Sequence, residues 1–150
     1  APTIGIRETR RLQGVTTLTG DDVRASAQPG DSIALGAWPI DVHPVDGVAG
    51  SHVMYVPDPY GIPYRALVPA TTDGLLAAGR CISVDREALG TVRVGATCTA
   101  TGHAAGTAAA LSALGGVRPR DLDVAELQSR LRGQGALLSP EDLEVVRSPR

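Results

Sequence analysis

The pattern of hydrophobic and polar positions changes its period along the chain and predicts strands first and helices later. In residues 3–18, isoleucines alternate with polar residues, which predicts one or two strands. Residues 31–43 predict a further extended segment, because Pro39 excludes a helix interior. The stretch from Pro44 to Pro63 is rich in proline and glycine, and its length and composition predict an irregular loop.

The middle of the chain predicts two more strands and a second loop. Residues 64–69 and 74–79 are short apolar runs separated by a turn-like stretch, and each predicts a short strand, the second one buried. Residues 80–93 are mostly polar and predict a loop. We therefore expect a strand that ends in the glycine-arginine pair Gly79-Arg80, followed by a loop and then a helix.

Four helices are predicted from their start and stop signals. Thr19 with an aspartate three residues later predicts the N-cap of a short helix. The run from about residue 95 to 114 predicts a long helix ended by two glycines. Asp123, which has Glu126 three residues later, predicts the N-cap of a third helix. Ser139, which is followed by a proline, predicts the N-cap of a fourth. The predicted fold class is α/β, with strands and helices in mixed α+β order.

The long predicted helix carries small residues on most of its sides. Gly102 and Gly106 lie in its interior, where each glycine costs about 1 kcal/mol relative to alanine. We expect close packing against a neighbouring element to offset this cost, so that Gly106→Leu overpacks the contact. The two cysteines, Cys81 and Cys98, are expected to be small buried residues.

Composition and charge exclude several classes of protein. The 150 residues suffice for one domain whose core is aliphatic, since only 3% are aromatic. The net charge of -2, with 14 arginines and no lysine, gives no sustained positive face for nucleic acid or an anionic membrane. There is no apolar run of about 20 residues and no secretion signal, so we expect a cytoplasmic protein.

The order of strand, glycine turn and helix N-terminus predicts a ligand cradle around Gly79 and Gly95. A strand that ends in glycine lets a ligand approach the main chain. The first N–H groups of a helix lack intrahelical partners and lie at the positive end of its dipole. Such an arrangement favours an anion or an electron-rich carbonyl group.

Six segments in one order carry a resemblance to a known family. They read IGIRETRR, WPIDVH, IPYRALVP, LLAAGRCIS, EALGTVRV and TGHAAGTAAAL. Together they resemble the C-terminal part of bacterial FAD-dependent oxidoreductases of the fumarate-reductase-like flavoprotein family, from about Thr3 to Leu138. The resemblance implies that FAD and a small-molecule substrate are the ligands. It places Gly79 and Arg80 by the ribityl or pyrophosphate group, and Arg93, Val94 and Gly95 by the flavin ring.

The resemblance also implies that this chain holds only part of a flavin site. The glycine-rich G-x-G-x-x-G turn that binds the ADP half of FAD is absent from the sequence. The chain starts without methionine inside a predicted strand, so we expect a fragment whose partner is the N-terminal part of the same protein. We expect residues 1–66 to belong to a substrate domain, 67–116 to the FAD-binding domain and 117–150 to C-terminal helices.

Three residues are candidates for the substrate side of the flavin. His43 follows Asp41 by two positions, so that in a strand both point to one face. Arg93 and Arg65 each have the planar guanidinium that binds a carboxylate with two prongs. Other interpretations stay open, namely a hydrogen-bonded His43 and an ion pair of Arg93 with Glu87.

The remaining histidines and the basic cluster near the start have less specific interpretations. His103 lies in the middle of the long predicted helix, and the polar end of its side chain is expected to be packed. His52 lies in the predicted loop. Residues 7–11 are expected to be solvated or ion-paired. The alternative to a flavoprotein is a cofactor-free interaction or oligomerisation module, and a homo-oligomer is compatible with either function.

Overall fold

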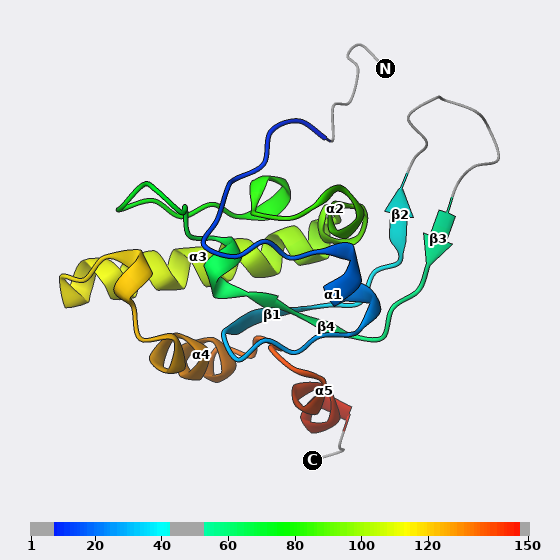
Figure 1. The fold of residues 1–150 in the computed structure, drawn as a ribbon. Helices are drawn as coiled ribbons and strands as arrows, with labels where there is room; N and C mark the ends of the chain where they lie inside the picture. The colour runs from blue at the N-terminus through cyan, green and yellow to red at the C-terminus, as the bar shows by residue number, and fades with distance from the viewer. Residues whose placement is uncertain (1–7, 43–52, 148–150) are drawn as a thin grey trace, which may run out of the picture.

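The computed structural model describes residues 8–42 and 53–147, which form a mixed α/β fold around two small antiparallel sheets (Figure 1). β1 (Ser32–Gly36) pairs with β4 (Tyr60–Pro63), and β2 (Ile40–Val42) pairs with β3 (Val53–Tyr55). The helices are α1 (Gly20–Arg24), α2 (Arg86–Val92), α3 (Gly95–Gly115), α4 (Val124–Gly133) and α5 (Pro140–Arg147), with single 3₁₀ turns η1 (Tyr64–Ala66), η2 (Gly79–Cys81) and η3 (Pro119–Asp121). This architecture agrees with the predicted α/β class.

The predicted helix signals are confirmed by the structure. Asp22 N–H donates to Thr19 Oγ1 at 3.2 Å, and Thr19 N–H donates to Asp22 Oδ2 at 2.9 Å, which forms a capping box on α1. α3 ends at Gly116, whose φ of 64° is the left-handed conformation that glycine adopts without steric cost. Asp123 accepts the N–H of Ala125 at 2.9 Å and caps α4.

The prediction of an irregular loop between Pro44 and Pro63 is wrong for the residues that form β3 and β4. β4 contains Tyr60 and Ile62, both fully buried, and its register places Ile62 opposite Ala34 of β1. Proline suggested irregular structure here, but Pro63 only ends the strand. Among the described residues β4 pairs with β1 alone, and a strand at the edge of a sheet tolerates proline.

The two strands and the loop predicted between residues 64 and 93 are also wrong. Residues 64–66 form η1, and residues 75–78 have no regular structure, with Leu75 half exposed. The predicted loop contains α2, which Asp85 caps by accepting the N–H of Ala88 at 2.7 Å. Local composition favoured strands, but in the described part of the chain no neighbouring strand pairs with these residues.

The strand prediction for residues 3–18 is wrong for the part that the structure describes, residues 8–18. These residues make only single bridges, at Gly14 with Pro69 and at Leu18 with Val84. The segment is nevertheless held by main-chain hydrogen bonds, such as Leu18 N–H to Ser83 O at 3.0 Å. Residues 1–7 lie outside the described residues.

One hydrophobic core joins the β1–β4 sheet to the helices around it. α3 packs on β1 through its buried residues Ala104 and Ala108, and α4 adds Leu127 and Leu131 (Figure 1). Tyr60 is one of the two largest buried side chains among the described residues, and its hydroxyl lies 2.9 Å from Thr91 Oγ1 of α2. Burial raises the pKa of Tyr60 to about 12, which keeps this hydroxyl neutral in the core.

Glycines inside the helices have opposite environments. A Cβ atom on Gly90 of α2 would lie 2.9 Å from Asp41 O and 3.1 Å from Asp41 N, so glycine allows α2 to touch the backbone of β2. A Cβ on Gly102 or Gly106 of α3 would meet no atom within 4 Å. Both α3 glycines are exposed, so the prediction that they pack closely, and that Gly106→Leu overpacks a contact, is wrong for this structure.

We expect Gly90→Ala and Gly106→Ala to change stability in opposite directions. Gly90→Ala should lower the free energy of unfolding by about 1–3 kcal/mol, because the methyl group overlaps the main chain of β2. Gly106→Ala should raise it by up to about 1 kcal/mol, because alanine favours the helix and the added atom is in open space. Urea denaturation followed by circular dichroism measures both, and equal effects of the two variants would contradict this packing.

Candidate functional site

The first turn of α3 presents main-chain donors that are free of protein partners. Counting from the start of α3, the first main-chain N–H that forms a helical hydrogen bond is that of Cys98, which donates to Val94 O at 2.9 Å. Within the described residues, the N–H groups of Gly95, Ala96 and Thr97 have no hydrogen-bond partner. Gly95 and Ala96 are exposed, and the turn contains no acidic residue that would compete with a ligand. This end of α3 can bind an electron-rich group.

The turn η2 lies against the same end of α3. Gly79 has a φ of 71°, and its N–H donates to Thr101 Oγ1 of α3 at 3.0 Å. A Cβ atom on Gly79 would lie 3.7 Å from Cys98 Sγ. The structure thus brings the predicted residues Gly79, Val94 and Gly95 to one end of one helix, although the strand predicted before Gly79 is absent.

Arg80 and the two cysteines surround this turn. Arg80 and Cys81 are exposed and Cys98 is half buried, so the expectation that both cysteines are buried is wrong for Cys81. Burial raises the pKa of the Cys98 thiol, while the charge of Arg80 lowers it. Arg80 therefore adds positive charge beside the start of α3.

Arg93 forms a buried junction between three segments rather than the ion pair with Glu87 considered from the sequence. Its side chain is 7% exposed, and it donates from Nη1 to Glu8 Oε1 at 3.2 Å. Its Nη2 donates to Asp41 O at 2.9 Å and to Asp41 Oδ2 at 3.3 Å. Glu87 instead pairs with Arg24 of α1. Arg93 thereby joins the end of α2 to β2 and to the N-terminal segment.

Arg65 lies in a different environment, beside the buried carboxylate of Asp31. Asp31 Oδ2 accepts the main-chain N–H of Arg65 at 3.1 Å and its Nε–H at 2.9 Å. The side chain of Arg65 is 58% exposed and that of Asp31 is 8% exposed. Sequence reasoning missed Asp31, and no local signal marks it, because its partner is 34 residues away.

The histidines fall into three situations. His43, predicted as catalytic, and His52 lie outside the described residues. His103 is exposed on α3 and its Nε2 lies 2.6 Å from Gln134 Oε1, so it is not packed in the core. The described residues contain no cluster of three or more side chains that could hold a metal ion.

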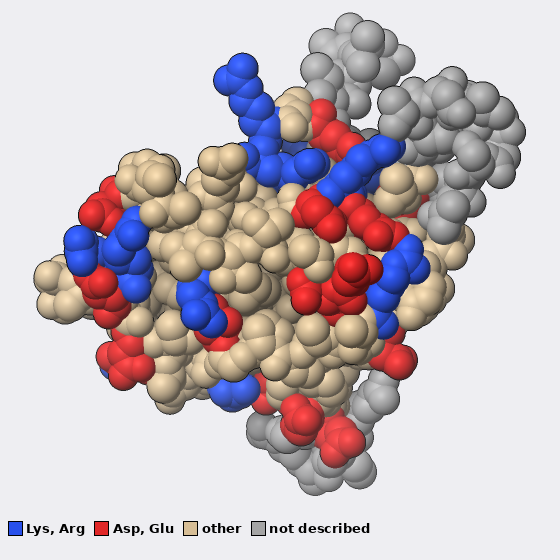
Figure 2. All heavy atoms as spheres, in the orientation of Figure 1, with Lys and Arg blue, Asp and Glu red and all other residues tan. Residues whose placement is uncertain are grey.

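The open side of α3 forms a shallow groove of about 690 Å³ against α4. Its lining residues are Gly102, His103, Gly106, Thr107, Ala110, Leu111, Leu114, Arg130 and Gln134. Leu114 is 87% exposed at its end. On the face seen in Figure 2, arginines and carboxylates are interspersed among large uncharged areas. Among the described residues, no helix has the length and hydropathy needed to cross a membrane.

Comparison with known families identifies the class of protein. The family model described as FAD dependent oxidoreductase matches residues 1–131, which is most of the chain. The chain therefore belongs to the FAD-dependent oxidoreductase family. No curated protein and no solved structure matches it significantly. The match supports the resemblance seen in the sequence at the level of this family.

The contacts of Arg93 lead to a prediction about stability. Arg93→Ala should lower the free energy of unfolding by about 1–3 kcal/mol, because it leaves charged and main-chain acceptors without their donor. Arg130→Ala should change it by less than about 0.5 kcal/mol, because Arg130 is 62% exposed and has only a surface partner, Glu126. Denaturant unfolding of both variants tests this, and indistinguishable midpoints would mean that the Arg93 junction contributes nothing to stability.

Proposed function

We propose that the chain contributes the flavin-facing part of a FAD-dependent oxidoreductase. The observation that carries the proposal is the start of α3, where three main-chain N–H groups without a partner among the described residues adjoin the Gly79 turn. Family membership supplies the identity of the cofactor. FAD, when bound, supplies hydride or electron transfer, and the protein supplies orientation and charge.

The residues of this chain fit such a role in a specific way. The N–H groups of Gly95, Ala96 and Thr97 would hold the pyrimidine edge of the flavin, where negative charge accumulates on reduction. Gly79 would let the ribityl chain or pyrophosphate approach the main chain, and exposed Arg80 would add a positive charge. Neither role requires a side chain to change its protonation state.

The ADP half of FAD needs a second contribution in this proposal. No G-x-G-x-x-G turn occurs in the sequence, so this chain holds only the flavin half. We propose that the ADP-binding segment lies in another part of a longer polypeptide, with this chain as its C-terminal part. The fumarate-reductase-like subfamily and the roles of His43, Arg93 and Arg65 at the substrate are further parts of the proposal.

An interaction module without a cofactor is the second candidate. The observation that favours it is the open groove on α3, with the exposed side chain of Leu114 at its end. This candidate predicts no response of the Gly95–Thr97 amides to FAD. The titration below therefore separates the two candidates.

We expect FAD to bind this chain weakly, with its contacts confined to residues 79–81 and 94–98. Titration of FAD into the ¹⁵N-labelled chain should shift the amide resonances of these residues in a saturable manner. Gly95→Pro should weaken this binding by up to about tenfold, because it removes one donor at a position where proline is compatible with a helix start. Gly95→Ala is the matched control, since it keeps the N–H and its added Cβ lies in open space.

Three outcomes would contradict the proposal. Absence of shifts at these amides in millimolar FAD would favour the cofactor-free module. Submicromolar affinity would mean that the chain holds the ADP half as well. Equal affinities of the proline and alanine variants would exclude the start of α3 as the binding element.

A further inference from the structure

The ion pair of Asp31 and Arg65 borders two cavities. Both residues line a cavity of about 490 Å³ and another of about 250 Å³. Main-chain hydrogen bonds hold the two residues side by side. The N–H of Arg65 donates to Asp31 Oδ2 at 3.1 Å, and the N–H of Tyr64 donates to Asp31 O at 2.8 Å. The Nε–H bond of Arg65 to Asp31 restrains the guanidinium beside the cavities.

The accessible charge at this pair is positive. Asp31 Oδ2 accepts hydrogen bonds from Arg65, and Asp31 Oδ1 is buried without a hydrogen-bond partner among the described residues. The Asp31 side chain is only 8% exposed and that of Arg65 is 58% exposed, so the guanidinium is the more accessible of the two charges. The Nη groups of Arg65 have no partner in the part of the chain that the structure describes. The hydrogen bond and charge of Asp31 also raise the pKa of Arg65. A ligand therefore meets a fixed cation.

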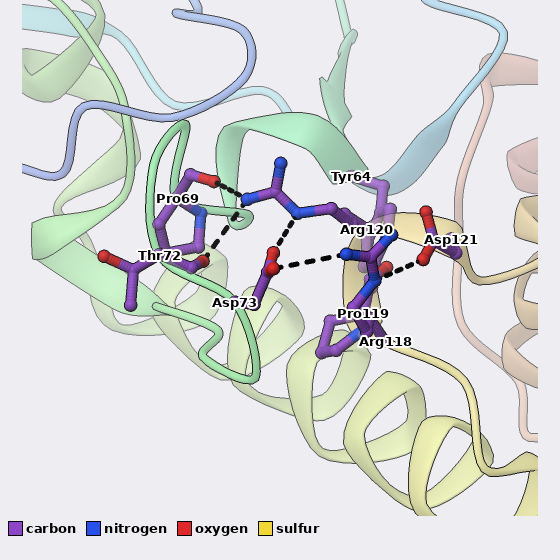
Figure 3. A network of polar contacts seen from close by, with 8 residues as sticks. All are labelled: Tyr64, Pro69, Thr72, Asp73, Arg118, Pro119, Arg120 and Asp121. Atoms are coloured by element: carbon purple, nitrogen blue, oxygen red, sulfur yellow. Dashed lines mark hydrogen bonds and ion pairs between the residues drawn. The ribbon is translucent and has the colours of Figure 1, made fainter.

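A second arginine borders the larger cavity. Arg120 is anchored to the loop at residues 69–73 by Nη2 donation to Pro69 O at 3.1 Å and by an ion pair with Asp73 (Figure 3). Arg118 reinforces this loop by binding Asp73 and Asp121. The Nη1 group of Arg120 has no partner among the described residues, so it can donate to a ligand.

The remaining walls of the larger cavity are apolar. Val15, Val68 and Val124 line it together with Tyr64, whose hydroxyl is already used by donation to Pro119 O at 2.8 Å. Val15 is 47% exposed, which leaves the cavity open to solvent. A volume of about 490 Å³ is in the range that small ligands occupy.

We propose that this cavity binds a small organic carboxylate with an aliphatic body. The two Nη groups of Arg65 match the two oxygens of a carboxylate, and Arg120 adds a further donor. The three valines would pack against the aliphatic body. An inorganic anion would leave these valines uncovered, so the observations favour an organic acid. The site uses none of the residues proposed to contact the flavin itself, although Arg65 is also a candidate for the substrate side of the flavin.

Titration of sodium hexanoate into the ¹³C-methyl-labelled chain, without flavin, tests the proposal. We expect saturable shifts of the methyl resonances of Val15, Val68 and Val124. Hexanamide, which has the same length and no charge, should bind at least about tenfold more weakly. Arg65→Gln should weaken hexanoate binding by a similar factor, while Arg130→Gln, on the α3 groove, should leave it unchanged.

A second variant keeps the test valid if Arg65→Gln fails to fold. Val15→Thr alters an exposed wall residue with little change of shape, and it should weaken binding of hexanoate more than that of acetate. Equal binding of hexanoate and hexanamide would overturn the proposal, and so would tighter binding of inorganic phosphate than of hexanoate. Because flavin is absent, such a failure leaves the flavin proposal to its own titration.

Discussion

Close approach of main chain to main chain is the constraint on which this fold depends. The sequence has no phenylalanine and only 3% aromatic residues, so few bulky side chains are available to fill space between elements. α2 meets the main chain of β2 at Gly90, and the N-terminal segment meets the main chain of Arg65 at Gly14, where a Cβ atom would lie 3.1 Å from Arg65 O. Main-chain hydrogen bonds then join irregular segments, as from Leu12 N–H to Cys81 O at 2.8 Å.

Features with local causes could be predicted from the sequence. The capping box at Thr19, the cap at Asp123 and the left-handed Gly116 depend on residues within a few positions, so their signals are complete in the sequence. β4 and α2 could not be predicted in the same way. β4 exists because it pairs with a distant strand, and α2 contains a glycine that is unfavourable in an isolated helix but necessary against Asp41.

The same distinction applies to the candidate site. Gly79 and Gly95 were predicted from the glycine turn and the helix start, and the structure brings them together even though the expected strand is absent. The environments of the arginines could not be predicted. Arg93 bonds to residues 52 and 85 positions away, and Arg65 bonds to one 34 positions away. Side-chain type alone does not distinguish a buried junction from an exposed donor.

The two positive regions offer different kinds of stabilisation, which bears on what each is suited to bind. The donors at the start of α3 are main-chain N–H groups, so they carry no proton that titrates, and the first turn of the helix contains no acidic residue. They suit a group whose negative charge appears only on reduction. Arg65 carries a full charge, and the carboxylate of its counter-ion Asp31 is almost fully buried. Such a group suits a ligand with a permanent charge. The hydrogen bond to Asp31 already restrains the guanidinium, so less conformational entropy is lost when the ligand binds.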